Sequence, residues 1–248
     1  MGLDQKIQTL SKRRPYSHSP YLVKPTVKGS KIQKDGSTKF VLRYTMPEAE
    51  SRSIEGVVVI SNDGAKAVVS YDFTPSARLV SETQFVELGL TLEMPERFDR
   101  VDWEGLGPLT SVPGKSKMNV FGNWAMHKDD YRFIGNRGEV KWAMAGRNAG
   151  NGERGIGNGG QGTGNGEREV LVLESGTGNV SFENIGGKIH LTENMVVAGY
   201  GGKASGPSGL KSPADIEMKG SFRIFAAELE GARHDVVPDL TFTQHYGF

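Results

Sequence analysis

The chain has 248 residues, 30 Lys and Arg against 29 Asp and Glu, 34 Gly and no Cys. A net charge of +1 excludes the broad positive excess with which nucleic-acid-binding domains hold phosphates. The absence of Cys excludes disulfides, thiol catalysis and Cys-bound metals. There is no apolar run of about 18 residues, the length that spans a bilayer, and no signal-peptide-like apolar segment near the N-terminus. We therefore expect no membrane contact and no signal peptide in this chain, and the compartment stays undetermined.

Residues 1–34 differ in composition from the rest, with eight Lys or Arg, one acid and a proline at positions 15, 20 and 25. Prolines at this spacing disfavour a helix. We predict a basic extended lead-in or linker at 1–34, lying along the surface of a single domain that spans 35–248. A basic arm for an anionic partner is the alternative.

From Thr38 onward the sequence is typical of β-strands. Apolar residues alternate from Phe40 to Met46, and two β-branched runs at Ile54–Ile60 and Ala67–Phe73 flank the turn signal Ser61–Gly64. In Val86–Met94 one face is wholly apolar, as in a half-buried strand. Further strands are predicted at Arg100–Trp103, Asn119–Met126, Glu139–Ala145, Glu169–Leu173, Asn179–Phe182, Lys188–Leu191, Met195–Ala198 and Ser221–Leu229. No segment sustains a helical period, so we predict an all-β sandwich.

Residues 146–166 contain ten glycines among 21 residues. Such a composition cannot bury enough apolar surface to offset the entropy of ordering it, so we predict a mobile surface loop. Its G-x-G-x-x-G string at 157–162 has no strand immediately before it and no helix after it, which argues against phosphate binding.

The polar residues indicate no catalytic, metal or cofactor site. The five histidines form no short His-x-x-x-His pair, and no G-x-S-x-G elbow is present. A calcium loop at Met126–Tyr131 is an alternative to a solvated turn. Acids cluster in sequence around Trp103, and we interpret them as a solvated face rather than a glycosidase pair; they are Glu93, Glu96, Asp99, Asp102 and Glu104. Trp103 is one candidate for sugar stacking, whereas Trp124 and Trp142 lie in alternating strands and are expected to fill the core.

Three segments resemble one family in order and approximate spacing. They are Phe98–Pro108, with the pattern F-D-x-V-x-W-x-G-x-G-P, Gly135–Trp142, with G-N-R-x-E-V-K-W, and Gly199–Gly202 followed by Gly206-Pro207. Together they resemble the C-terminal, small-chain (fifth) domain of family 2 β-galactosidases over nearly the whole chain.

The resemblance implies a twisted β-supersandwich of the galactose-mutarotase-like kind. It also implies that the catalytic glutamates belong to a TIM barrel, which this chain lacks, so we expect the chain alone to be inactive. As a non-catalytic domain it would help to form the carbohydrate site or the oligomer of a glycoside hydrolase, with a preceding barrel domain or subunit as its partner. The family's Asn-Tyr and Asp-Arg elements do not follow Gly107-Pro108, and the third segment lacks a stacking Trp.

We predict a weak site for a galactoside-like sugar around Tyr200, with Asn136, Arg137 and Lys203 as polar partners. The flanking glycines leave the Tyr200 ring accessible, and amide and guanidinium groups supply the donors and acceptor that a polyol needs.

Alternatives are a stand-alone carbohydrate-binding or scaffolding module, the small chain of a two-chain β-galactosidase, and an aldose epimerase. An epimerase needs a His and a carboxylate on one face, and only His127 and His190 fall on predicted strands or their ends.

Overall fold

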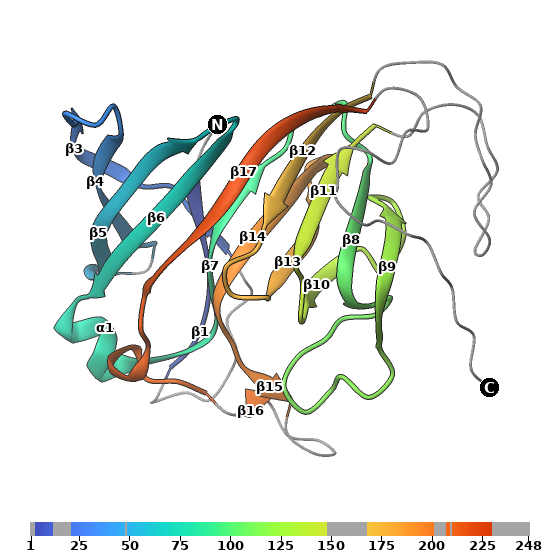
Figure 1. Cartoon of the computed structure of the whole chain (residues 1–248). Coiled ribbons are helices and arrows are strands. Elements are labelled where there is room, and N and C mark those ends of the chain that lie inside the picture. Colours follow the sequence, from blue (N-terminus) through green and yellow to red (C-terminus); the bar gives the residue numbers. More distant parts are fainter. Residues whose placement is uncertain are drawn as a thin grey trace.

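The computed structural model of the chain describes residues 3–11, 21–47, 49–147, 168–200, 207–208 and 210–229. In this part of the chain two antiparallel sheets face each other and enclose the core (Figure 1). The all-β sandwich predicted from the sequence is confirmed. None of the described helices is long and apolar enough to cross a membrane.

The smaller sheet has six strands and is called the six-stranded sheet below. Across the sheet they are β10 (Ile134–Arg137), β13 (Val180–Ile185), β14 (Lys188–Val197), β7 (Thr83–Glu93), β1 (Leu3–Ser11) and β2 (Tyr21–Val23).

The larger, nine-stranded sheet packs against it. Its order is β3 (Thr26–Ile32), β4 (Thr38–Met46), β5 (Ala49–Asp63), β6 (Lys66–Pro75), β17 (Lys219–Leu229), β12 (Arg168–Glu174), β11 (Trp142–Gly146), β8 (Arg100–Gly107) and β9 (Val120–His127). A two-stranded ribbon of β15 (Gly199–Tyr200) and β16 (Pro207–Ser208) lies beyond the end of β14, and two short helices complete the described chain, α1 (Ala77–Glu82) and the 3-10 helix η1 (Pro213–Asp215).

The alternation in β7 determines which face of the six-stranded sheet meets the core. Leu88, Leu90 and Leu92 are fully buried against the larger sheet, whereas Gly89 and Thr91 lie on the opposite face, as the period of two requires. In the pairing of β14 with β7, Glu193 lies opposite Leu90 and Thr192 lies opposite Thr91. Glu193 therefore faces the core, and Thr192 faces away from it.

Trp103 was expected to be available for stacking on a sugar, and Trp142 was expected to fill the core; the structure differs at both. Trp103 is fully buried, packs edge-on against Phe182 with ring centroids 5.1 Å apart, and so offers no face to a sugar. Trp142 does not join the main core; it packs with Val170 and Val172 in a second apolar cluster on the outer face of the nine-stranded sheet. Ala143 and Ala145 take the inward positions of β11 because they alternate with Trp142.

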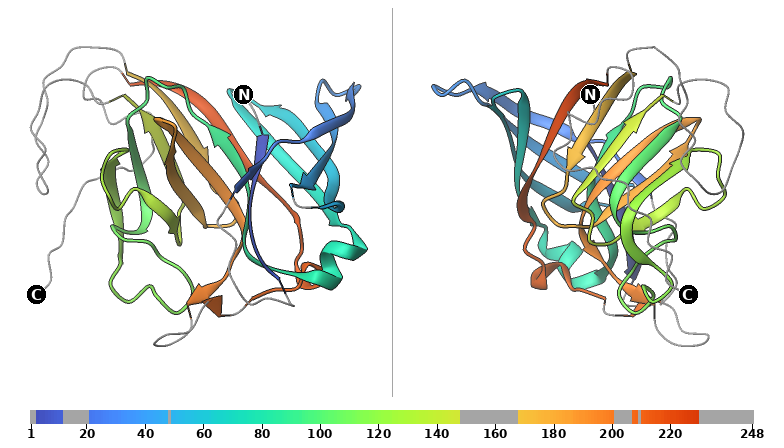
Figure 2. Two further views of the ribbon diagram at one scale, coloured as in Figure 1. Left: turned by 180° about the vertical axis from the view of Figure 1, so that it is seen from behind. Right: turned by 45° about the vertical axis from the view of Figure 1, so that its right-hand side comes forward.

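The described part of residues 1–34 contributes strands to both sheets. β1 pairs with β7 from Leu3↔Leu92 to Ser11↔Thr83, and β3 forms an edge of the nine-stranded sheet (Figure 2). Of this segment, β1 lies inside a sheet, where its backbone groups bond to β7 and β2. Apart from Gly146 and Arg147, the predicted Gly-rich loop at 146–166 lies outside the described residues.

Candidate functional site

Arg137 of β10 is fully buried, although it was predicted as a polar partner for a sugar. Its guanidinium donates to the backbone carbonyls of Arg132 at 2.9 Å and Gly135 at 3.1 Å. The same group lies over the Trp103 and Phe182 rings, with centroids 5.4 and 5.3 Å away. Burial lowers the pKa of Arg137 to about 10. These contacts show that Arg137 holds the turn before β10 against the aromatic core.

Asn136 is also buried, with 3 % of its surface exposed. Its Nδ2 donates to the carbonyl of Ser111 at 2.7 Å and to Oδ1 of Asn179 at 3.2 Å. Its Oδ1 accepts from Nδ2 of Asn194 at 3.0 Å. Asn136 therefore ties the loop around Ser111 to β14 and to the start of β13.

The hydrogen bonds continue across the outer face of the six-stranded sheet. Asn194 Nδ2 also donates to Ser181 Oγ at 2.7 Å, and Ser181 Oγ donates to Glu87 Oε1. On the same face the hydroxyl groups of Thr91 and Thr192 form a hydrogen bond, with their oxygens 2.8 Å apart. This polar row spans β10, β13, β14 and β7, where alternation alone predicts only a solvated sheet face.

Gly199 brings the third family-like segment to the same loop. A Cβ built on Gly199 would lie 2.2 Å from the carbonyl oxygen of Pro113, closer than any real Cβ contact. Ser111 lies two residues before Pro113. Its carbonyl oxygen accepts a hydrogen bond from Asn136, which belongs to the second family-like segment. The loop at 111–113 thus joins the two segments that were predicted to converge. Tyr200 follows on β15, and Lys203 lies outside the described residues.

Replacing Gly199 by Ala is expected to displace the loop at 111–113, because the new methyl group and Pro113 cannot occupy the same space. We expect the free energy of unfolding to fall by about 1–3 kcal/mol. Urea denaturation measures this loss. The control is Gly64→Asn at the β5–β6 turn, where φ is +62° and nothing lies within 4 Å of a built Cβ. Asn tolerates this conformation, and an equal loss in both variants would contradict the close-contact explanation.

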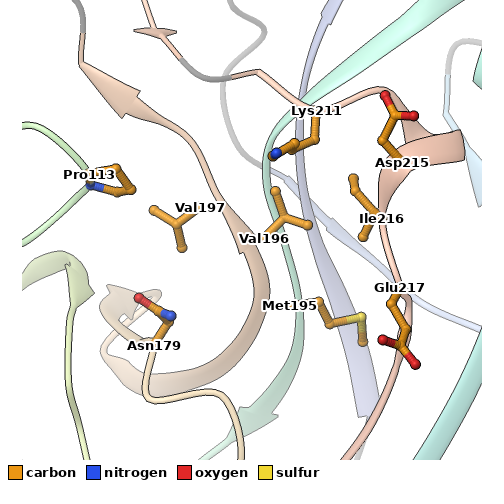
Figure 3. Close-up of a pocket in the computed structure, with 9 residues that line it drawn as sticks. All are labelled: Pro113, Asn179, Met195, Val196, Val197, Lys211, Asp215, Ile216 and Glu217. Atoms are coloured by element: carbon orange, nitrogen blue, oxygen red, sulfur yellow. The ribbon is translucent and has the colours of Figure 1, made fainter.

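A cleft of about 410 Å³ opens beside this loop (Figure 3). Its apolar wall comes from the end of β14 and from Ile216, and its polar groups come from Asn179 and the segment at 211–217. The lining residues are Pro113, Asn179, Met195, Val196, Val197, Lys211, Asp215, Ile216 and Glu217. Met195 sits at a register shift of β14 against β7, between Asn194 and Val196. Such bulges re-aim a side chain.

The sequence analysis did not single out Lys211, Asp215 and Glu217. Charged residues in a Pro-containing segment are typical of a solvated turn. The segment reaches the cleft because the backbone of Lys211 pairs with Phe85 at the start of β7, a contact between residues far apart in the sequence.

Glu193 is a second buried polar group that sequence reasoning missed. Its Oε1 accepts from the backbone N–H groups of Gly176 and Thr177, both at 2.8 Å, and from the Ser175 hydroxyl at 3.1 Å. Its Oε2 has no hydrogen-bond partner among the residues that the structure describes. Burial raises the pKa of Glu193 above its ordinary value, although these three donors act to lower it. The carboxyl group anchors the β12–β13 turn to the inner face of β14.

Three of the five acids around Trp103 form ion pairs. Glu93 pairs with Lys188, Glu104 with Lys141 and Asp102 with Arg100, each at 2.6 Å. Trp142 also donates to Glu104 at 3.0 Å.

In the described ranges no group of three His, Asp or Glu side chains is arranged to hold a metal ion. At the alternative calcium loop, the carboxylate of Asp130 is paired with Arg132, and this bond lowers the pKa of Asp130 to about 2.

Comparison with known sequences matches residues 10–186 to the family described as the β-galactosidase small chain. The match covers strands of both sheets, including β7, β8, β9, β10 and β13. The chain belongs to the β-galactosidase small-chain family. No curated protein sequence matches this family member significantly.

Solved structures similar to this family member include two α-galactosidases of family GH36 from Geobacillus stearothermophilus. AgaB has a TM-score of 0.48 and 7 % identity, covering 90 % of this chain and 30 % of its own. A variant of AgaA in complex with 1-deoxygalactonojirimycin has a TM-score of 0.47 and 9 % identity, with the same coverage. The chain spans about 30 % of the length of these two enzymes.

Proposed function

We propose that the chain is a non-catalytic domain of a β-galactosidase-type glycoside hydrolase, of the family 2 kind, with a galactose-mutarotase-like supersandwich fold. Its partner is a catalytic barrel domain or subunit, and its part in the enzyme is to supply one wall of the carbohydrate site. The observation that carries the proposal is the match of residues 10–186 to the β-galactosidase small-chain family.

The cleft beside Pro113 is the place at which we propose that the sugar contacts this domain. Its volume of about 410 Å³ falls within the usual range for small-molecule sites. Met195, Val196 and Ile216 offer an apolar wall for the C–H face of a pyranose, and Lys211, Asp215 and Glu217 offer groups that bond hydroxyls.

The four predicted sugar-binding residues take two roles in this proposal. Tyr200 remains a proposed direct contact, since β15 follows directly after the strand end that lines the cleft. Lys203, outside the described residues, remains a proposed polar partner from the sequence. Asn136 and Arg137 are buried, so we assign them the positioning of the loop at 111–113 and of β10.

A titration of the isolated chain with galactose and lactose, followed by NMR, tests the carbohydrate contact. We expect millimolar affinity, or about −4 kcal/mol, with shifts concentrated at Pro113 to Lys115, Val196 to Tyr200 and Lys211 to Glu217. The variant Lys211→Ala should weaken binding, while Lys31→Ala on the distant strand β3 should leave it unchanged. Shifts confined to other residues, or none at saturating sugar, would contradict the site.

The same preparation should not hydrolyse aryl β-galactosides. The proposal assigns the catalytic carboxylates to the partner, and Glu93, Asp102 and Glu104 are held in ion pairs. Turnover that copurifies with the chain and is lost in Glu93→Gln or Glu104→Gln would overturn the non-catalytic assignment.

A further inference from the structure

Asn179 lines the cleft from the turn before β13, and its side-chain amide has two unlike ends. The oxygen of such an amide only accepts hydrogen bonds, and the nitrogen only donates them. The end that faces the cleft therefore decides which kind of ligand atom Asn179 binds. The hydrogen bonds around Asn179 determine the direction of this amide before any ligand is present.

The carbonyl of Ser111 determines the direction of the neighbouring amide, Asn136. A backbone carbonyl only accepts, so the Asn136 atom that lies 2.7 Å from it is the donor Nδ2. The same Nδ2 group also donates to Asn179, at 3.2 Å. The atom of Asn179 on this side is therefore its acceptor, Oδ1.

The rest of the polar row excludes the opposite direction. Asn136 Oδ1 accepts from Asn194 Nδ2 at 3.0 Å, and Asn194 Nδ2 also donates to Ser181 Oγ at 2.7 Å. Ser181 donates in turn to the carboxylate of Glu87, which only accepts. Reversing any amide of the row would place two donors or two acceptors together. Because Asn136, Ser181 and Asn194 are buried, water cannot relieve such a mismatch.

The nitrogen end of Asn179 lies on the side of the cleft. Its Nδ2 donates to the carbonyl of Thr177 at 3.3 Å, which uses one of its two hydrogens, and no second acceptor among the described residues bonds to it. Figure 3 shows the oxygen of Asn179 on the side of Pro113 and the nitrogen on the side of Met195. Asn179 therefore offers the cleft an N–H donor and no acceptor.

We propose that Asn179 is a specificity-determining residue of the cleft, which donates to a sugar oxygen and selects for an acceptor at that point of the ligand. The inference rests on the proposed function and adds to it the kind of ligand atom that faces this wall. A neutral sugar satisfies the N–H with a hydroxyl or ether oxygen. An analogue with a hydrogen or a protonated amino group at that position has no acceptor to offer and leaves the N–H unpaired.

The buried row makes this selection possible. An amide that turned freely would present its oxygen to a donor and its nitrogen to an acceptor, so it would bind either kind of atom. Asn179 cannot turn without losing the bond from Asn136 and the bond to Thr177. A site built to bond a particular hydroxyl rejects the analogue that lacks it far better than an apolar pocket does. Asn136 thus acts on the ligand through Asn179.

NMR titration of the full chain with galactose and its monodeoxy analogues tests the donor. In the wild type the side-chain NH2 signals of Asn179 should shift with galactose. One monodeoxy sugar should bind roughly two- to tenfold more weakly, which corresponds to the loss of one hydrogen bond. Asn179→Ala should bind galactose as weakly as the wild type binds that analogue, and should no longer distinguish the two sugars. The matched control is Asn184→Ala, which removes an exposed amide that also donates to a backbone carbonyl, that of Lys128 at 3.1 Å, and should behave like the wild type.

The variant Asn179→Asp distinguishes a donor from any polar contact. Its carboxylate keeps an acceptor for Asn136 but offers the cleft no N–H. The amino sugar that carries a protonated amino group at the position found above should gain affinity relative to galactose in this variant, whereas the wild type should reject it.

The wild-type titration does not depend on the stability of the variants, and its outcomes separate this inference from the proposed function. If galactose shifts the backbone signals of the cleft while the NH2 signals of Asn179 stay unchanged, and Asn179→Ala binds like the wild type, Asn179 is not the donor although the sugar site stands. If no sugar shifts the signals of the cleft, both the sugar site and the role of Asn179 are wrong.

Discussion

Replacing Arg137 by Ala is expected to lower the free energy of unfolding by about 3–5 kcal/mol. The substitution leaves the carbonyls of Arg132 and Gly135 without their donor and removes the cation that packs on Trp103 and Phe182. The loss of a buried charge offsets only part of this cost, because the guanidinium is bonded to carbonyls at several points. Urea unfolding followed by tryptophan fluorescence measures the change.

Two further variants separate the contacts of Arg137 from its charge. Arg137→Lys keeps the cation, but a single ammonium cannot reproduce the planar fork that reaches several carbonyls, so it should recover only a small part of the loss. Arg97→Ala removes an exposed arginine paired with Glu169, and such solvent-exposed pairs contribute little to stability. An Arg137→Ala protein as stable as Arg97→Ala would show that Arg137 does not hold the turn before β10.

The second large effect concerns Glu193. Removing its side chain as Ala leaves the N–H groups of Gly176 and Thr177 and the Ser175 hydroxyl without their acceptor. We expect a loss of about 2–4 kcal/mol. Replacement by Gln keeps an acceptor oxygen for these donors and should be much milder near neutral pH.

The pH dependence gives Glu193 a signature of its own. The pKa of Glu193 is raised above the ordinary value of 4.5 in the folded chain, so between these two values the folded state binds more protons than the unfolded state. The contribution of Glu193 to stability therefore falls as the pH rises through this window. The Gln variant has no such proton, so its stability relative to the wild type should increase with pH. Burial, with a further contribution from Glu193, also raises the pKa of the facing Tyr71, to about 12.

A control of opposite sign is available at the surface. The Arg97 guanidinium holds the pKa of Glu169 below its ordinary value, so the contribution of Glu169 is lost as the pH falls through the folded-state pKa. Glu169→Gln should therefore differ from the wild type above this window and converge with it in acid. If Glu193→Gln showed that same trend, the assignment of a raised pKa to Glu193 would be wrong.

The strands of this fold were predictable where local pattern and tertiary role agree. The hairpin expected at Ile54–Ile60 and Ala67–Phe73 is β5 and β6, and the expected strand Val86–Met94 is β7. Val86–Met94 shows a clear period of two because one face of β7 meets the core, whereas the hairpin is marked by two runs of β-branched residues on either side of Ser61–Gly64. The predicted pieces Lys188–Leu191 and Met195–Ala198 are one strand, β14, interrupted by a bulge at Met195. The polar residues Thr192, Glu193 and Asn194 between them concealed its continuity.

β1 and α1 could not be predicted in this way. Leu3–Ser11 has little alternation of its own, and it is a strand because β7 and β2 lie on either side of it. Helix α1 is a six-residue turn that begins after Ser76, whose Oγ accepts from the N–H of Leu79 at 3.4 Å. So short a helix shows no sustained period.

The candidate site was predictable only in part. The family-like segments pointed to the region of Asn136 and Gly199. They did not show that Asn136 and Arg137 are buried. Burial depends on the loop at 111–113 and on the rings of Trp103 and Phe182, which come from other parts of the chain. The cleft residues Lys211, Asp215 and Glu217 carry no local signal, since they are placed by pairing over long distances in sequence.

The position of β17 has a consequence for how the protein is made. It lies between β6 and β12 and so joins the four strands β3 to β6 with the four strands β12, β11, β8 and β9. A growing polypeptide cannot close the nine-stranded sheet until Lys219–Leu229 has left the ribosome. Before that moment β6 and β12 both present open edges, which are sites of association with other unfinished chains. We therefore expect assembly of this sheet to follow synthesis rather than accompany it, and expression of chains shortened before Lys219 to give aggregated protein.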